Sequence, residues 1–357
     1  MSEAIIAVDI GTTNIETILC TKDRTVTDYR SVRNEQRRYG SDVASRICSA
    51  ASGHADEMRA CVLSQLCGLI AELTVQHPEC SVENVVIAGN TTMLHILLGY
   101  DCGGLGMYPF KTVSLSSLET TLHGLLNDFY GGDLPDIPDL PLTILPGISA
   151  YIGADIYAGA VACGFAQSSE VNMLIDLGTN AELIIGNKDR ILTASAAAGP
   201  AFESGRIFKG TEGIEMMHRL LELGVIDRTG LMKEEYFEQP AQKNIRKLQL
   251  AKAAIRAAIT ILTDKYREYG VYDLAHIFIS GNFGNNINET ACIAVGMLPG
   301  SFAGRIVPAG NTVLEGCVSY ILDPSSRPSV ERIEEVVLAN EPGFNDLLMN
   351  SIDLNAV

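Results

Sequence analysis

Two short stretches of the chain carry the same chemically active residues in the same order. The first is AVDIGTTNIETIL, from Ala7 to Leu19, and the second is LIDLGTNAELII, from Leu174 to Ile185. In each stretch an apolar run leads into Asp, and Gly and Thr follow before a second apolar run begins. Asp9 and Asp176 are separated by close to half of the 357-residue chain. A repeat with these residue types indicates two similar halves that share one chemistry.

These residue types suit a nucleoside triphosphate and its Mg²⁺ ion. Gly lets the backbone approach a phosphate, and amide and Thr hydroxyl groups donate to the phosphate oxygens. An Asp before the turn can hold a water of the Mg²⁺ shell, because this ion keeps several waters in proteins. We therefore expect Asp9 and Asp176 to hold the metal's water shell. The expected phosphate-binding residues are Gly11, Thr12, Thr13, Gly178, Thr179 and Asn180. An ordinary hairpin turn also favours Gly and Thr, so the prediction depends on the pair.

The elements that must hold these turns alternate between strands and helices. Short apolar runs bounded by turn residues predict strands over 5–10, 14–20, 84–88, 173–177, 181–185 and 276–280. Apolar positions at helical spacing predict helices over 41–51, 58–74, 147–165 and 244–269. This alternation predicts an α/β fold in two halves, 1–166 and 167–357. Residues 101–146 are rich in Gly, Pro and Asp and predict an irregular insertion, and the chain from Ser329 predicts a polar helix and tail.

Composition restricts the partners and the compartment. The formal net charge is −17 at pH 7, so we expect no nucleic-acid partner. We find no run of ~20 apolar residues and no cationic start of an export signal, so we expect a cytoplasmic protein outside the membrane. The nine cysteines are odd in number and have no CxxC spacing. We therefore expect no disulfide framework, zinc site or iron–sulfur cluster.

The pair of hairpins resembles the superfamily of acetate and sugar kinases, heat-shock chaperones and actin, known as ASKHA. A small-residue helix before the second hairpin and a late Gly-Asn-Phe-Gly turn add to this resemblance, which covers nearly the whole chain. The resemblance implies two ribonuclease-H-like halves with a nucleotide cleft between them. Aligning the chaperones' helix with ADIYAGAVACG places Asp155 where they carry a Glu that positions the attacking water. A surface or capping Asp is the alternative.

The same resemblance implies a surface for adenosine. The chaperones contact ribose and adenine through an acidic residue and a Lys three positions later on a long helix. Gln249 and Lys252 occupy these positions here and share a helix face, although a solvated polar stripe fits Gln249 equally well. The turn that follows the 276–280 strand resembles the adenosine loop, which implies roles for Gly281, Asn282 and Gly284.

Five ordered motifs resemble one family more closely, the ATP-dependent reductive activators of corrinoid proteins. The motifs are NEQRRYGSDVASRI (34–47), AGNTTMLH (88–95), LPGISAYIGAD (145–155), IDLGTNAEL (175–183) and AAGPAFESG (197–205). The resemblance implies MgATP binding, a homodimer and docking on a cobalamin-carrying protein. It also implies that ATP drives electrons uphill to Co(II), which regenerates Co(I).

Two departures from the family pattern affect what is carried over. Family members usually have an N-terminal iron–sulfur domain, whereas this sequence begins at the first ATPase strand, so we expect a separate electron donor. The family's Asn-Pro-Gln reads Asn34-Glu35-Gln36 here, and Ser204 interrupts the last motif, which puts a role of Glu203 in doubt. Arg37, Arg38 and Arg46 could bind phosphate or a partner, and a solvated charged face is the expectation for them.

Three functions remain compatible with the sequence. The first is an ATPase that activates a corrinoid protein with an outside electron source. The second is a small-molecule kinase in which Asp155 acts as the base. The third is a nucleotide-dependent binding protein without catalysis. The five ordered motifs favour the first.

Overall fold

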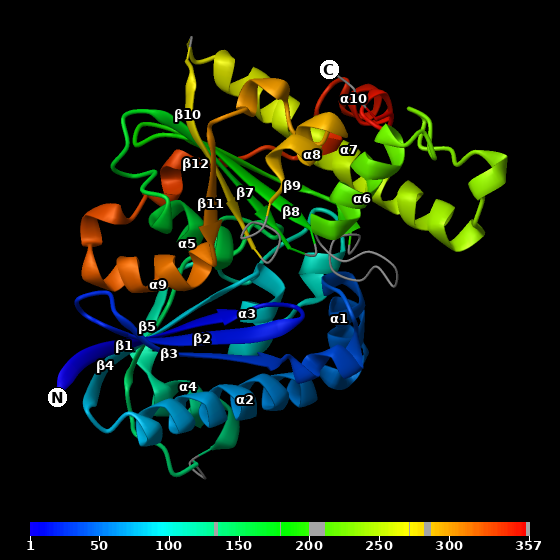
Figure 1. Cartoon of the computed structure of the whole chain (residues 1–357). Coiled ribbons are helices and arrows are strands. Elements are labelled where there is room, and N and C mark those ends of the chain that lie inside the picture. Colours follow the sequence, from blue (N-terminus) through cyan, green and yellow to red (C-terminus); the bar gives the residue numbers. More distant parts are fainter. Residues whose placement is uncertain (132–134, 179, 200–210, 271, 282–286, 355–357) are drawn as a thin grey trace. The chain divides into compact units, whose positions relative to one another are not determined.

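The computed structural model divides the chain into two compact units (Figure 1). It describes residues 1–131, 135–178, 180–199, 211–270, 272–281 and 287–354. Unit 1 comprises Met1–Gly164 and Thr312–Val330, and unit 2 comprises Phe165–Asn311 and Glu331–Val357. The predicted division left all residues after 166 in the second half. The structure instead places the segment Thr312–Val330 in unit 1, because its helix α9 (Thr312–Leu322) packs against elements of unit 1.

Unit 1 is built on a six-stranded sheet in the order β3-β2-β1-β4-β6-β5. The strands β1, β2 and β3 form an antiparallel meander, and β4 and then β6 extend the sheet in parallel with β1. The strands are β1 (Ser2–Ile10), β2 (Asn14–Thr21), β3 (Val26–Arg33), β4 (Cys80–Gly89), β5 (Leu118–Thr121) and β6 (Pro141–Ile144). The helices are α1 (Val43–Ser49), α2 (Ala55–Gln76), α3 (Thr91–Leu98), α4 (Leu122–Tyr130), α5 (Ala154–Ala162) and α9 (Thr312–Leu322).

Unit 2 is built on a second six-stranded sheet in the order β11-β10-β7-β8-β9-β12. The strands β7, β8 and β9 form the meander here, and β10 and β11 extend the sheet in parallel with β7. The strands are β7 (Val171–Leu177), β8 (Ala181–Gly186), β9 (Ile191–Ala196), β10 (Leu274–Ser280), β11 (Ile306–Gly310) and β12 (Ile333–Glu335). The helices are α6 (Thr211–Glu222), α7 (Gln239–Arg267), α8 (Glu289–Ala294) and α10 (Phe344–Asn350).

The sequence repeat is therefore a repeat of topology. The core orders β3-β2-β1-β4-β6 and β9-β8-β7-β10-β11 are the same, and each repeated hairpin is the first hairpin of its sheet. The central strands are apolar because helices cover both of their faces. The run Ala4–Val8 is completely buried, as are Met173, Leu174 and Ile175 in β7. The prediction of an α/β fold with two similar halves is confirmed.

The predicted irregular insertion over 101–146 contains a strand of the core sheet. β6 pairs in parallel with β4, with Val85 beside Leu142 and Ile87 beside Ile144. β5 and α4 also lie within the segment. The prediction was wrong for this part. β6 is only four residues long and follows a proline-rich stretch, so its apolar run is too short to be recognised as a strand.

One helical run, Val43–Gln76, is long and apolar enough to cross a membrane by length and composition, which the sequence analysis did not anticipate. It joins α1 to α2 through a kink at Gly53, where φ is 98°. Of its most apolar window, 56% is buried inside the structure, and side chains such as Leu63, Leu66 and Ile70 are completely buried. The run thus has the burial of a core helix.

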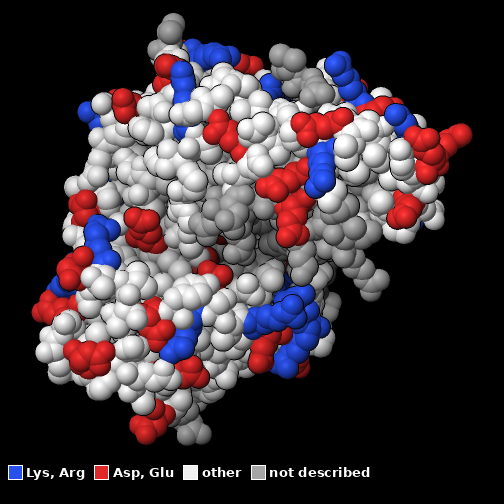
Figure 2. All heavy atoms as spheres, in the orientation of Figure 1, with Lys and Arg blue, Asp and Glu red and all other residues white. Residues whose placement is uncertain are grey.

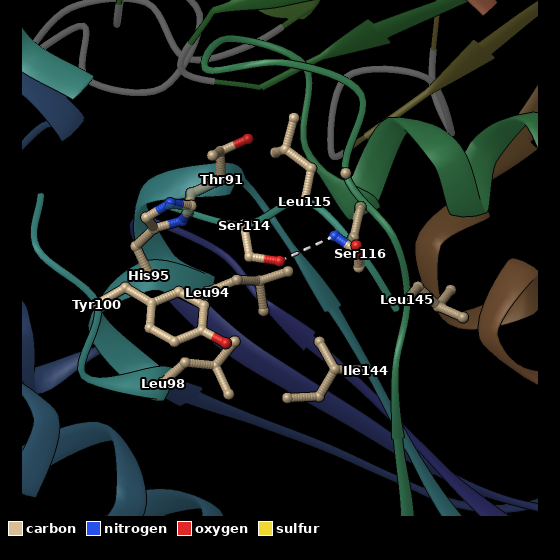
Figure 3. A pocket seen from close by; sticks show the side chains of 12 residues that line it. Thr91, Leu94, His95, Leu98, Tyr100, Ser114, Leu115, Ser116, Ile144 and Leu145 are labelled. Carbon is tan, nitrogen blue, oxygen red and sulfur yellow. Dashed lines mark hydrogen bonds between the residues drawn. The ribbon is translucent and has the colours of Figure 1, made fainter. Parts of the chain in front are cut away.

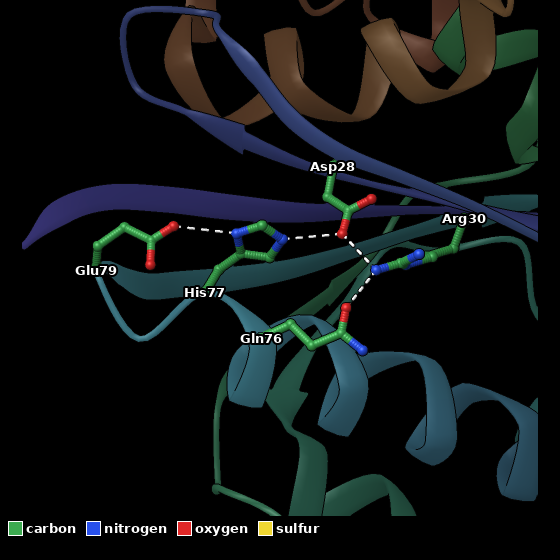
Figure 4. A network of polar contacts seen from close by, with 5 residues as sticks. All are labelled: Asp28, Arg30, Gln76, His77 and Glu79. Carbon is green, nitrogen blue, oxygen red and sulfur yellow. Dashed lines mark hydrogen bonds and ion pairs between the residues drawn. The ribbon is translucent and has the colours of Figure 1, made fainter.

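A polar network fastens the outer strand β3 to the end of α2 (Figure 4). The Asp28 carboxylate accepts hydrogen bonds from Arg30 at 2.7 Å and from His77 Nε2 at 2.9 Å, and His77 Nδ1 lies 3.0 Å from Glu79. The hydrogen bond to Asp28 raises the pKa of His77, and the same bond lowers the pKa of Asp28. No side chain of β3 is fully buried, so polar contacts replace apolar packing at this edge.

Close packing joins α9 to α5, and it gives a stability prediction. A Cβ placed on Gly316 would lie 2.0 Å from the carbonyl oxygen of Ala158, so only glycine fits without a shift of one helix. We expect Gly316→Ala to lower the free energy of unfolding by about 1–3 kcal/mol in urea denaturation. The matched control is Gly68→Ala on the exposed side of α2, where a Cβ meets nothing within 4 Å. It should gain up to ~1 kcal/mol from helix propensity, and a Gly316→Ala protein of wild-type stability would contradict the close packing.

Candidate functional site

The first group of predicted site residues lies at the carboxyl ends of β1 and β4 in unit 1. The parallel register places Ile10 beside Gly89, and a Cβ on Gly89 would lie 2.7 Å from the carbonyl oxygen of Ile10. The two strand ends therefore touch through their backbones. The turn from Gly11 to Thr13 follows directly, and Asp9 precedes it with a partly exposed side chain. We call this turn the first turn.

Asn90 ties the first turn to the neighbouring helix. Its Oδ1 accepts from the amide of Met93 at 3.0 Å and so caps α3, while its Nδ2 donates to the Thr12 hydroxyl at 3.1 Å. The Thr12 oxygen is thereby used as an acceptor, and the hydroxyl retains its own hydrogen as a donor. Asn90 therefore both caps α3 and contacts the first turn.

The start of α5 brings Asp155 to the same end of the sheet. A Cβ on Gly153, the residue before α5, would lie 2.6 Å from Asn90 Cα and 2.7 Å from the amide nitrogen of Thr91. The N-terminal end of α5 therefore packs on the connection between β4 and α3. Asp155 is the second residue of this helix and is partly exposed, and its Oδ1 lies 2.8 Å from the amide nitrogen of Ile156.

The second group lies at the carboxyl ends of β7 and β10 in unit 2. The register places Asp176 beside Ser280, and the Ser280 hydroxyl donates to Asp176 Oδ2 at 2.9 Å. Burial around this carboxyl raises its pKa, and the hydrogen bond from Ser280 opposes the shift. The amide of Gly178 donates to the carbonyl of Asn180 at 3.0 Å and closes the hairpin turn.

Gly281 belongs to the same edge of the second sheet. Its φ is +82°, and a Cβ there would lie 2.6 Å from the carbonyl oxygen of Leu177. The structure thus brings Asp176, Gly178, Asn180 and Gly281 together. The predicted residues Thr179, Asn282 and Gly284, like Glu203 and Ser204, lie outside the described residues.

Gln249 and Lys252 have other contacts in the structure. Both side chains are completely buried on α7. Gln249 Nε2 donates to the carbonyls of Thr229 at 2.9 Å and Ile352 at 3.2 Å, and Lys252 Nζ donates to the carbonyl of Asp353 at 2.5 Å. Neither side chain is exposed to solvent, so the two do not form a solvated polar stripe. Both fasten the C-terminal segment to α7.

The burial of Lys252 predicts a pH dependence of stability. Burial lowers the pKa of Lys252 from 10.5 to about 8, so the unfolded chain binds more protons than the folded chain between these values. Stability should therefore rise with pH from about 8 to 10.5, by up to ~3 kcal/mol from this group. Urea denaturation of Lys252→Met should lack this increment, whereas Lys247→Met, at an exposed position of α7, should keep it. An equally steep rise in Lys252→Met would contradict the assignment.

The arginines of the 34–47 motif do not form one solvated face. Arg37 and Arg38 are exposed, but Arg46 is completely buried, so the expectation was wrong for Arg46. Sequence analysis could not detect this burial, because it depends on contacts with Thr12 and Met93, which lie far from Arg46 in the sequence. Figure 2 shows Lys, Arg, Asp and Glu side chains scattered over one face of the chain, with one group of Lys and Arg side chains close together.

Sequence analysis missed one acidic residue in each hairpin. Glu16 lies directly opposite Asp9 in the β1–β2 register, and Glu182 lies directly opposite Asp176 in the β7–β8 register. Both are partly exposed. The two halves therefore repeat a cross-strand pair of acidic residues next to the hairpin turn. The signal was available, because both quoted stretches contain this Glu.

A small pocket of unit 1 lies beside α3. It is lined by residues of α3 and of the 114–116 and 144–147 segments (Figure 3). His95 lines it. Its Nδ1 lies 2.8 Å from the carbonyl of Thr91, and its Nε2 accepts from the amide of Val113 at 3.1 Å. Burial lowers the pKa of His95. These contacts fix a neutral ring, so His95 acts as a core residue.

Comparison with known proteins was made for the family and for individual relatives. The family model described as the RACo middle region matches residues 5–168. The model described as the C-terminal domain of RACo, the ASKHA domain, matches residues 170–216 and 239–356. Together the two models cover nearly the whole chain, with their boundary between the two repeated halves.

Two curated relatives are similar over most or much of the chain. The corrinoid activation enzyme RamQ of Eubacterium limosum is 26% identical over 426 aligned residues, which cover 96% of this chain and 69% of RamQ. The [Co(II) methylated amine-specific corrinoid protein] reductase of Methanosarcina barkeri is 25% identical over 260 residues, which cover 56% of this chain and 48% of the reductase. The chain thus spans about half to two thirds of the length of these relatives.

One solved structure has the same fold over the whole chain. The reductive activator for corrinoid,iron-sulfur protein superposes with a TM-score of 0.82 at 24% identity, over 99% of this chain and 66% of the activator. Its fold agrees with the two topologically equivalent sheets described above. From the two family models and this shared fold, we conclude that the chain belongs to the RACo family and contains its middle region and its C-terminal ASKHA domain.

Proposed function

We propose that the chain binds and hydrolyses MgATP and couples this cycle to the activation of a corrinoid-carrying protein. The observation that supports this most is the repeated site. In each unit an Asp is the last but one residue of the strand that precedes a Gly-containing hairpin turn, beside a parallel neighbouring strand. Two such sites provide the carboxylates and donors that a magnesium triphosphate requires.

The side chains present fit this ligand. The first turn offers amides and the Thr12 hydroxyl as donors, and the second group offers Asn180 and the backbone of Gly281, which approaches the carbonyl of Leu177 too closely for a Cβ. Mg²⁺ would neutralise phosphate charge when bound. Asp9 and Asp176 would hold its water shell, and Gly11, Thr13, Gly178 and Thr179 would complete the phosphate contacts.

Asp155 would orient the attacking water by accepting its hydrogen bond. Its position at the start of α5, against the Asn90 connection, supports this role. Adenosine would lie against the backbone from Gly281, with Asn282 and Gly284. Gln249 and Lys252 are left out of this surface, because their polar atoms already bond to the C-terminal segment.

The proposed partner is a cobalamin-carrying protein, and electrons would come from a donor outside this chain. The names of the relatives support the partner: one is a corrinoid activation enzyme and another a reductase of a Co(II) corrinoid protein. The proposed assembly is a homodimer in the cytoplasm.

The decisive experiment follows cobalt reduction by absorbance. Purified chain, a Co(II) corrinoid protein and a low-potential reductant should yield Co(I) only when MgATP is present, and phosphate release should rise when the corrinoid protein is added. ADP in place of ATP is the control. ADP formation that responds to a sugar or an organic acid without release of inorganic phosphate, and that does not respond to a corrinoid protein, would identify a kinase and reject the proposal.

A further inference from the structure

Arg46 is a buried cation that has no role in the ATP-binding site proposed above. It lies on α1 with 0% of its surface exposed. Its guanidinium donates to the carbonyl of Gly40 at 3.1 Å, to Gln36 Oε1 at 3.3 Å, to Met93 Sδ at 2.9 Å and to the carbonyl of Thr12. All of these acceptors are neutral, and Asp42 acts on Arg46 only through space. Among the described residues Arg46 has no ion pair, and burial lowers its pKa to about 10 because an uncompensated charge is costly in the interior.

Arg46 and Asn34 together hold three successive carbonyls of the first turn. The side-chain Nδ2 of Asn34 donates to the carbonyl of Gly11 at 2.9 Å, and the backbone N–H of Asn34 donates to the carbonyl of Thr13 at 2.9 Å. Arg46 takes the carbonyl between them. Asn34 is 1% exposed, so this support is built into the interior of unit 1.

This arrangement orients the other side of the turn. In a trans peptide the N–H points opposite to the C=O, so the three peptide planes direct their N–H groups away from Asn34 and Arg46. Successive N–H groups that point one way form a concave site for an anion. A cation on the carbonyl side polarises these peptides and strengthens their N–H groups as donors.

We propose that Arg46 is a positioning residue for the phosphates of the nucleotide, acting through the first turn rather than by contact. Its buried charge is balanced when the anionic phosphates bind on the opposite side of the same peptides. The inference rests on the proposed nucleotide site. The positive charge of Arg46 would make the unit 1 half of that site bind more highly charged nucleotides more tightly.

The test measures dissociation constants of ATP, ADP and AMP by calorimetry for wild type, Arg46→Met and Arg46→Lys. Arg46→Met should weaken ATP by about 10- to 100-fold, ADP less and AMP least, because the lost term scales with ligand charge. Arg46→Lys keeps the charge and should recover part of the ATP affinity. Arg59→Met is the matched control, because Arg59 is also buried in unit 1 and donates to a carbonyl, that of Leu97, at 2.9 Å.

A second variant decides the question if Arg46→Met does not fold. Gln36→Glu places a carboxylate at the position that lies 3.3 Å from the Arg46 guanidinium, which supplies the missing counter-charge. It should lower ATP affinity more than AMP affinity. Equal losses for all three nucleotides, or unchanged affinities in folded variants, would overturn the inference. Absence of MgATP binding by the wild type would instead reject the proposed function.

Discussion

MgATP affinity is expected to fall about 10- to 100-fold when Asp9 is replaced by alanine, as is typical when a residue that orients a metal's ligands is removed. Asp9 is the last but one residue of β1, and β1 ends where the first turn begins. Its carboxylate is partly exposed at this strand end, where it can hold a water of the Mg²⁺ shell. The loss should be confined to the metal complex, so ATP measured in EDTA should bind wild type and Asp9→Ala with similar, weaker affinity.

The control for Asp9 is Glu3→Gln, which removes a negative charge from the opposite end of the same strand. Glu3 is exposed and pairs with Lys22 on the surface. Calorimetric titration of both variants with MgATP separates a local metal effect from the overall charge of the protein. Equal MgATP affinity in wild type and Asp9→Ala would argue strongly against a metal role for this carboxylate.

The repeated hairpins were predictable because two different constraints favour the same pattern. A strand buried on both faces requires a continuous apolar run, and a turn that approaches a ligand requires Gly. The runs before Asp9 and Asp176 satisfy both, so the ends of these strands and the positions of the turns followed from the sequence. The topological repeat then followed from the position of the second hairpin near the middle of the chain.

The rest could not be predicted because it depends on contacts between distant segments. Arg46 is buried by Gln36, Met93 and the first turn, and none of these contacts leaves a periodic signal in the sequence. Gln249 and Lys252 have the spacing of a solvated stripe, but the C-terminal segment covers them. The helix α9 belongs to unit 1 because it packs against α5, β1 and β4, and Gly316 approaches Ala158 across half of the chain.

Phosphate release is expected to fall about 100- to 10,000-fold in Asp155→Asn, while MgATP affinity stays close to that of wild type. The amide of Asn keeps the shape of the side chain and an oxygen at the start of α5, where Asp155 Oδ1 lies 2.8 Å from the amide nitrogen of Ile156. What it loses is the negative charge and the acceptor strength that, in the proposed mechanism, would orient the attacking water. Removal of a group that acts only in the transition state lowers the turnover number and leaves ground-state binding unchanged.

Asp56→Asn is the matched control for Asp155→Asn, because Asp56 is also the second residue of a unit 1 helix and also follows an alanine. Single-turnover phosphate release and calorimetry on both variants separate catalysis from helix capping. A capping role alone predicts the same small change in both variants, visible in thermal unfolding and absent from turnover. Wild-type turnover in Asp155→Asn would show that another residue positions the water, whereas a selective loss of turnover with intact MgATP binding would identify α5 as the catalytic helix of unit 1.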